Sequence, residues 1–199
     1  MWITSGGVFT QRIQEPKSFY LTSFTEDSVK ELHDVVNSCI KLRQTILPIH
    51  IESPGGLVHY LMGILSAIEY ARENGIKVAT YVSGVAASCA ALVLAYGDEG
   101  FRFSSKNSTI MFHNISSGFV GKIDESKEYF INCETLEARC FEKVSKHLKK
   151  NKDWLKKNLE KRKNYDWEVS PEECLSLGIV NHIKTPSFVL VVQENCIVL

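Results

Sequence analysis

Several signatures of common protein classes are missing from this 199-residue sequence. Its 23 basic side chains equal its 23 acidic ones, so no net charge favours a nucleic acid or an anionic membrane as partner. The opening MWITSGGVFT lacks the basic and apolar regions of a secretory signal, and the apolar run AALVLA is too short to cross a bilayer. We therefore expect a cytoplasmic protein that binds neither nucleic acid nor membrane.

Metal-binding spacings are missing as well. The six cysteines are scattered without a C-x-x-C pair, and no two of the six histidines have the H-E-x-x-H spacing. Cysteines in a reducing cytoplasm are free thiols. We expect no metal site, no cofactor and no disulfide.

Strand and helix patterns alternate along the chain. Strand patterns occupy residues 18–24, 46–53, 77–84, 101–105, 108–114, 179–183 and 188–193. Helical patterns occupy residues 25–42, 57–74, 88–97, 124–163 with one interruption near Asn151, and 170–177, with Thr25, Asp124 and Ser170 as N-caps. This alternation predicts an α/β fold of mostly parallel, closely stacked strands with a helical protrusion, in a single domain of residues 1–199.

The turn SPGG at residues 53–56 follows a buried-type strand and precedes a helix. Its two glycines allow a close approach of backbone to backbone or to a ligand, and the exposed N–H groups at a helix start can hold an anion. Pro-Gly is also ordinary turn chemistry, so the motif alone does not distinguish a site from a turn.

Ser88 stands behind the small-residue stretch GVAA, at the start of an apolar helix. A helix N-terminus supports an oxyanion, with the N–H of Cys89 as a donor, but a serine in a close helix contact has the same pattern. His113 ends a strand-like run, where a structural histidine is equally at home. A nucleophilic serine needs a base, so Ser88 and His113 together indicate a catalytic site more strongly than either residue does alone.

In this order, SPGG, GVAAS and STIMFHN resemble the proteolytic subunit of Clp protease, ClpP, a family of serine peptidases with the ClpP/crotonase fold. The matching stretches are IESPGGLVHYLMGILSAIEYAR, TYVSGVAASCAALVLAYGDEGFRF and NSTIMFHN. GFVGKIDESKEYFINCETLEARCFEKV resembles the protruding handle (residues 116–150), and DWEVSPEECLSLGIVNHI resembles the C-terminal block. The resemblance covers residues 18–183.

The resemblance implies a catalytic triad. Ser88 matches the nucleophile, His113 the general base and Asp166 the acid. Gly56 and Cys89 match the two backbone N–H donors of the oxyanion hole. The function implied is that of a serine endopeptidase.

The resemblance also implies substrates and partners. In the family an extended peptide pairs with the handle strand, which places Gly55, Leu57, Ser116, Ser117 and Gly118 at the substrate. Family members form stacked heptameric rings and work with an AAA+ unfoldase, so we expect self-association and, as a further partner, such an ATPase.

Four features depart from the family pattern. Tyr165 stands where the family carries Arg, and Asn114-Ile115 replaces Gln-Pro after the histidine. The N-terminal segment (residues 1–17) is short and unlike the family's axial loop, and a C-terminal extension (residues 184–199) is added. Three alternatives therefore stay open: a catalytically silent or regulatory ring subunit, a phage capsid-maturation protease, and a crotonase-like enzyme acting on acyl-CoA thioesters.

Overall fold

The computed structural model describes residues 8–116, 120, 122–163 and 165–196. The helices are α1 (Glu26–Lys41), α2 (Val58–Glu73), α3 (Cys89–Ala95), α4 (Ile123–His147), α5 (Trp154–Lys161) and α6 (Pro171–Leu177). The strands are β1 (Val8–Gln14), β2 (Phe19–Leu21), β3 (Ile46–Ser53), β4 (Lys77–Ala87), β5 (Arg102–Ser104), β6 (Thr109–Phe112), β7 (Trp167–Val169), β8 (His182–Ile183) and β9 (Leu190–Cys196).

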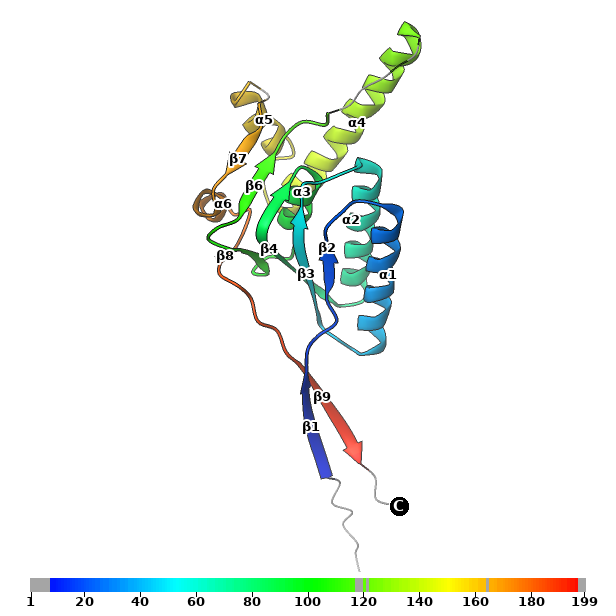
Figure 1. The fold of residues 1–199 in the computed structure, drawn as a ribbon, viewed down its shortest axis with the longest axis vertical. Helices are drawn as coiled ribbons and strands as arrows, with labels where there is room; N and C mark the ends of the chain where they lie inside the picture. The colour runs from blue at the N-terminus through cyan, green and yellow to red at the C-terminus, as the bar shows by residue number, and fades with distance from the viewer. Residues whose placement is uncertain (1–7, 117–119, 121, 164, 197–199) are drawn as a thin grey trace, which may run out of the picture.

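The main sheet is mostly parallel and branches at β4. Strands β2, β3, β4, β5 and β8 follow one another in parallel, and β6 pairs in parallel with the second half of β4. Only β7, on β6, runs antiparallel within this sheet. Helices α1 and α2 lie side by side along it (Figure 1). The predicted α/β class is therefore confirmed.

Local signals placed most helix ends correctly. The Thr25 hydroxyl accepts from the N–H of Ser28 at 3.2 Å, and the Ser170 hydroxyl accepts from the N–H of Glu173 at 3.1 Å. The predicted cap Asp124 is wrong, because the chain already turns helical at Ile123 and the N-cap is Lys122. Asp124 instead lies in the first turn, where its negative charge interacts favourably with the positive end of the helix dipole.

The long helical region divides in two near the predicted point, between His147 and Trp154. Helix α4 projects beyond the body, and only its second half packs on the core, through Cys140, Phe141 and Val144 (Figure 1). The protruding half of α4 is therefore the predicted helical protrusion.

The two ends of the chain pair with each other. Strand β1 runs antiparallel to β9, from Val8 opposite Cys196 to Gln14 opposite Leu190. This ribbon extends away from the main sheet (Figure 1). The sequence predicted a strand at 188–193 but none within residues 8–14, because its partner lies at the far end of the chain.

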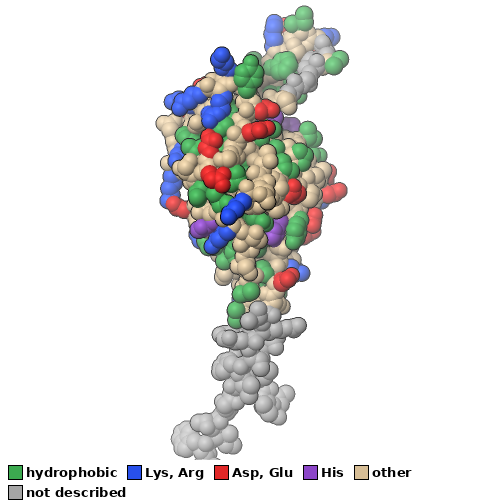
Figure 2. All heavy atoms as spheres, turned by 60° about the vertical axis from the view of Figure 1, so that its left-hand side comes forward, with side chains coloured by type: hydrophobic (Ala, Val, Ile, Leu, Met, Phe, Trp, Pro, Cys, Tyr) green, Lys and Arg blue, Asp and Glu red, His purple; other side chains and the backbone are tan. Residues whose placement is uncertain are grey.

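Charges of both signs are mixed on the face that Figure 2 shows. Figure 2 shows Lys and Arg side chains and Asp and Glu side chains on the same face, without a large area of one sign. This distribution agrees with the zero net charge. No helix in the described ranges combines the length and the apolar character that crossing a bilayer requires.

Candidate active site

Ser88 stands between the end of β4 and the start of α3, as the N-cap residue of that helix. Its backbone has φ 57° and ψ −124°, a region that side-chain-bearing residues rarely adopt. The N–H of Ser88 donates to the carbonyl of Met111 at 2.8 Å, which ties the residue to β6. Such strain persists only where the surroundings impose it, and it gathers at functional sites.

The SPGG turn is pressed against Ser88. Gly55 has φ +103°, and a Cβ there would lie 2.7 Å from the Cβ of Ser88 and 2.8 Å from the carbonyl oxygen of Ala87. The N–H of Gly55 donates to the hydroxyl of buried Ser53 at 3.2 Å. Only glycine fits this position, so the close packing of Gly55 fixes the SPGG turn relative to Ser88.

Gly56 and Cys89, whose N–H groups are the predicted oxyanion donors, line the same cavity. Within the described residues neither N–H donates to a backbone or side-chain oxygen, and the Cys89 sulfur lies beside both of them. The thiol of buried Cys89 donates to the carbonyl of Gly56 at 3.2 Å, which fixes the turn to the first residue of α3. Burial raises the pKa of this thiol above its ordinary value, which keeps it protonated and able to donate.

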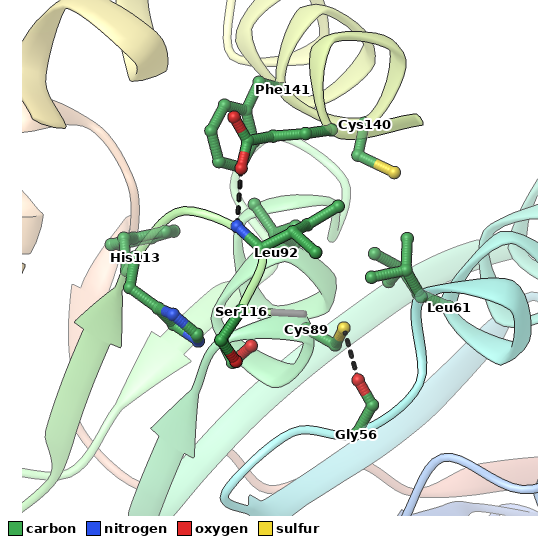
Figure 3. Close-up of a pocket in the computed structure, with 13 residues that line it drawn as sticks. Gly56, Leu61, Cys89, Leu92, His113, Ser116, Cys140 and Phe141 are labelled. Carbon is green, nitrogen blue, oxygen red and sulfur yellow. Dashed lines mark hydrogen bonds between the residues drawn. The ribbon is translucent and has the colours of Figure 1, made fainter. Parts of the chain in front are cut away.

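Ser88 lines a cavity of about 60 Å³, which Figure 3 shows between His113, Cys89 and Phe141. The predicted residues Gly56, Ser88, Cys89, His113 and Ser116 all line it. Its remaining walls are largely apolar and come from Val58, Leu61, Leu92, Phe112, Ile115, Glu137, Cys140 and Phe141. The fold thus brings four of the five predicted triad and oxyanion residues to one hollow.

Asp166 is the member that does not line this cavity. Strand β6 pairs with β7 so that Phe112 faces Trp167, and the same register continued by one residue sets His113 opposite Asp166. Asp166 is exposed and His113 half-buried, and no hydrogen bond joins these side chains in the described part of the chain. The fold makes the two neighbours without a direct bond.

Glu137 is a cavity residue that sequence reasoning missed. Its carboxylate accepts from the N–H of Ile115 at 2.5 Å, which ties α4 to the segment after His113 (Figure 3). Burial raises the pKa of Glu137, against the opposing effects of the Ile115 N–H and of Lys156. Nothing in its helical spacing separates it from the exposed acids of α4, so no sequence signal could have found it.

A second hollow of about 150 Å³ continues along the start of α2. Gly56, Leu57, Ile115 and Ser116 line it, so the N-terminus of α2 faces the segment that follows His113. Leu57 is 64% exposed and free to meet a ligand. The predicted substrate residues Ser117 and Gly118 lie outside the described residues.

Among the described ranges, no three His, Cys, Asp or Glu side chains gather closely enough to hold a metal ion. The cysteines of those ranges up to Cys174 are free thiols. The side chains at the cavity that carry a hydroxyl, thiol, imidazole or carboxyl group are Ser88, Cys89, His113, Ser116, Glu137 and Cys140.

The mostly parallel, branched sheet with a projecting helix and a strained serine between strand and helix defines a ClpP-type α/β protein. The family model described as Clp protease matches residues 21–187. The chain belongs to the Clp protease family and is a ClpP-like protease by that membership.

Proposed function

We propose that the protein is a serine endopeptidase of the ClpP type, which cleaves peptides and unfolded polypeptides with Ser88 as its nucleophile. One observation carries the proposal: strained Ser88 shares a cavity with His113 and with Gly56 and Cys89, whose N–H groups donate to no oxygen of the described residues. Family membership supplies the reaction class.

In the acylation step, His113 removes the proton from the Ser88 hydroxyl while that oxygen bonds to the peptide carbonyl carbon. The negative charge on the carbonyl oxygen is held by the N–H groups of Gly56 and Cys89. The protonated histidine then passes its proton to the amide nitrogen, the C–N bond breaks, and the amine product leaves. Asp166 orients the imidazole and stabilises its charged form.

Deacylation repeats the same proton movements with water. His113 removes a proton from a water molecule whose oxygen attacks the ester carbon. The oxyanion again rests on the two N–H groups, and the proton returns to the Ser88 oxygen as the carboxylic acid leaves.

The hollow beside Leu57 and Ser116 suits an extended peptide. In our proposal Gly55, Leu57, Ser116, Ser117 and Gly118 bind the substrate backbone by strand addition, which makes little demand on sequence. The apolar cavity that Ser88 lines takes the side chain that precedes the cleaved bond.

Assembly is part of the proposal. The resemblance favours self-association into stacked heptameric rings in the cytoplasm through the handle of a single-domain subunit, with an AAA+ unfoldase as the partner for folded substrates. Helix α4 supports this, because its first half projects with exposed Ile123, Phe130 and Ile131.

A silent or regulatory ring subunit is the second candidate. It is favoured by the unbonded pair His113 and Asp166 in the described structure and by Tyr165 in place of the family's arginine. Such a subunit would assemble with an active relative and cleave nothing alone.

Hydrolysis of a fluorogenic peptide by the purified wild-type chain separates the two candidates. We expect turnover by the wild type and by Ser66→Ala, a matched exposed serine of α2 that bonds only the carbonyl of Met62. We expect Ser88→Ala to lose activity by about 10⁴-fold or more. Absence of wild-type turnover, with sedimentation showing intact rings, would favour the silent subunit.

A further inference from the structure

Glu52 is the next-to-last residue of β3, and its carboxylate joins three consecutive residues of β4. It accepts from the N–H of Gly84 at 2.8 Å and from the N–H of Val85 at 3.0 Å. It also accepts from the hydroxyl of Ser83 at 2.9 Å. A Cβ on Gly84 would lie 2.4 Å from one oxygen of this carboxylate, so a larger residue there would displace the Glu52 side chain.

These bonds close an irregularity in the sheet. Ile51 pairs with Val82, but the next paired residue of β3, Ser53, pairs with Ala86. One residue of β3, Glu52, therefore lies opposite three residues of β4, Ser83–Val85. The N–H groups of Gly84 and Val85 have no backbone acceptor on β3, and the Glu52 carboxylate accepts from both instead.

Strand β4 changes partners at the same place. Its first half pairs with β5 through Thr80–Val82, whereas Val85–Ala87 pairs with β6. The residue after this second stretch is Ser88, and the strand on its far side leads directly to His113. The bulge held by Glu52 therefore sets the direction in which the chain leaves the sheet at Ser88 and at His113.

We propose that Glu52 is a positioning residue for the reaction: its three hydrogen bonds hold the bulge that aims Ser88 at the oxyanion N–H groups and at His113. The inference rests on the proposed peptidase function. Glu52 itself is exposed and is absent from the walls of the catalytic cavity, so it acts through the backbone of β4.

The carboxylate is needed for its two acceptor oxygens. In Glu52→Gln one oxygen becomes an amide NH₂, a donor that cannot accept from the N–H groups of Gly84 or Val85. Glu52→Ala removes all three bonds, and Ser83→Ala removes one while leaving both backbone bonds. The matched control is Glu99→Gln, an exposed carboxylate that pairs with Lys149 and touches no backbone N–H.

The experiment measures kcat and KM for a short peptide, the rate of labelling by a fluorophosphonate, and Tm for each variant. We expect Glu52→Gln and Glu52→Ala to lower kcat and the labelling rate by about 10- to 100-fold, because small misplacements of a nucleophile are costly. KM should stay within about twofold, since the binding hollow is not touched. Ser83→Ala should show a smaller loss, and Glu99→Gln none.

Two results would overturn the inference alone: an active wild type with kcat unchanged in both Glu52 variants, or a loss of kcat that only follows a loss of folded protein. A wild type that neither labels nor cleaves would overturn the proposed function and the inference with it. The activity of the wild type therefore distinguishes failure of the Glu52 inference from failure of the proposed peptidase function.

Discussion

The nucleophile half of the site, which is Ser88 with its oxyanion N–H groups, and the base half, which is His113 with Asp166, are held by different kinds of contact. On the nucleophile side, Gly55 contacts Ser88 directly and the Cys89 thiol bonds to Gly56, so backbone packing fixes each group. On the base side, His113 and Asp166 adjoin only through the register of β6 and β7, and their side chains share no hydrogen bond in the described residues.

The difference separates what one chain fixes from what it leaves adjustable. On the nucleophile side, glycine packing, strand pairing and the bonds of the Glu52 and Cys89 side chains hold the backbone groups in place together. A half-buried histidine and an exposed aspartate can reorient at little cost, because water satisfies them meanwhile. We therefore expect the oxyanion site to exist in the isolated chain and the His113–Asp166 bond to form when the site is covered.

The largest effect should come from the base. His113→Asn removes proton transfer, and we expect kcat to fall by about 10⁴-fold. Asp166→Asn should cost about as much, on the order of 10⁴-fold, because it removes the orientation and charge stabilisation of the imidazole. Steady-state kinetics on one peptide measures both losses.

Glu172→Gln is the control for Asp166, since it is an exposed acid of the neighbouring helix α6. It should match the wild type. An Asp166→Asn variant with full activity would remove Asp166 from the site, and the search for an orienting acid would turn to Glu137 on the cavity wall.

The turn offers a sharper test of the nucleophile half. Gly55→Ala and Gly100→Ala both place a Cβ on a residue with positive φ, at +103° and +82°, but only Gly55 has neighbours within 4 Å. Each change should cost about 1 kcal/mol in unfolding free energy from backbone strain. Only Gly55→Ala should also lose kcat, because its Cβ displaces Ser88. Equal kinetics in the two variants would contradict the account of this contact.

The smallest effect concerns pH. Burial raises the pKa of Glu137, so the fold disfavours its charged form. Its stability contribution is present below the ordinary carboxyl pKa and is lost as pH rises through the raised value. Tm of the wild type minus Tm of Glu137→Gln should therefore fall as the pH rises from below the ordinary carboxyl pKa through the raised pKa of Glu137. A difference that is flat or rises over this range would contradict the assigned burial.

Much of the fold follows from local patterns in the sequence. Capping side chains at Thr25 and Ser170 and the glycine after α6 placed helix ends to within a residue. The apolar strand at 46–53 was predicted with the bounds the structure shows. These features depend on neighbours in sequence, which is why they could be foreseen.

Contacts between distant segments could not be foreseen. Three such contacts are the pairing of β1 with β9, the hydrogen bonds of Glu52 to β4, and the hydrogen bond between the Ile115 N–H and Glu137. Each joins residues that are far apart in the sequence, and no periodic pattern in the sequence indicates it. Ser88 and His113 stand out in the sequence by their places at a helix start and at the end of a strand-like run, whereas Asp166 was chosen by family resemblance alone. The structure adds the shared cavity of the first two and the register that sets the third beside His113.

The most direct test of the central claim is the intact mass of the wild-type chain after treatment with a fluorophosphonate, with Ser88→Ala treated in parallel. An activated serine among oxyanion N–H groups forms a stable phosphonyl ester with such a reagent. The account predicts one adduct on the wild type, mapped by peptide sequencing to Ser88, and none on the variant. An unlabelled wild type, or equal labelling of both proteins, would contradict it.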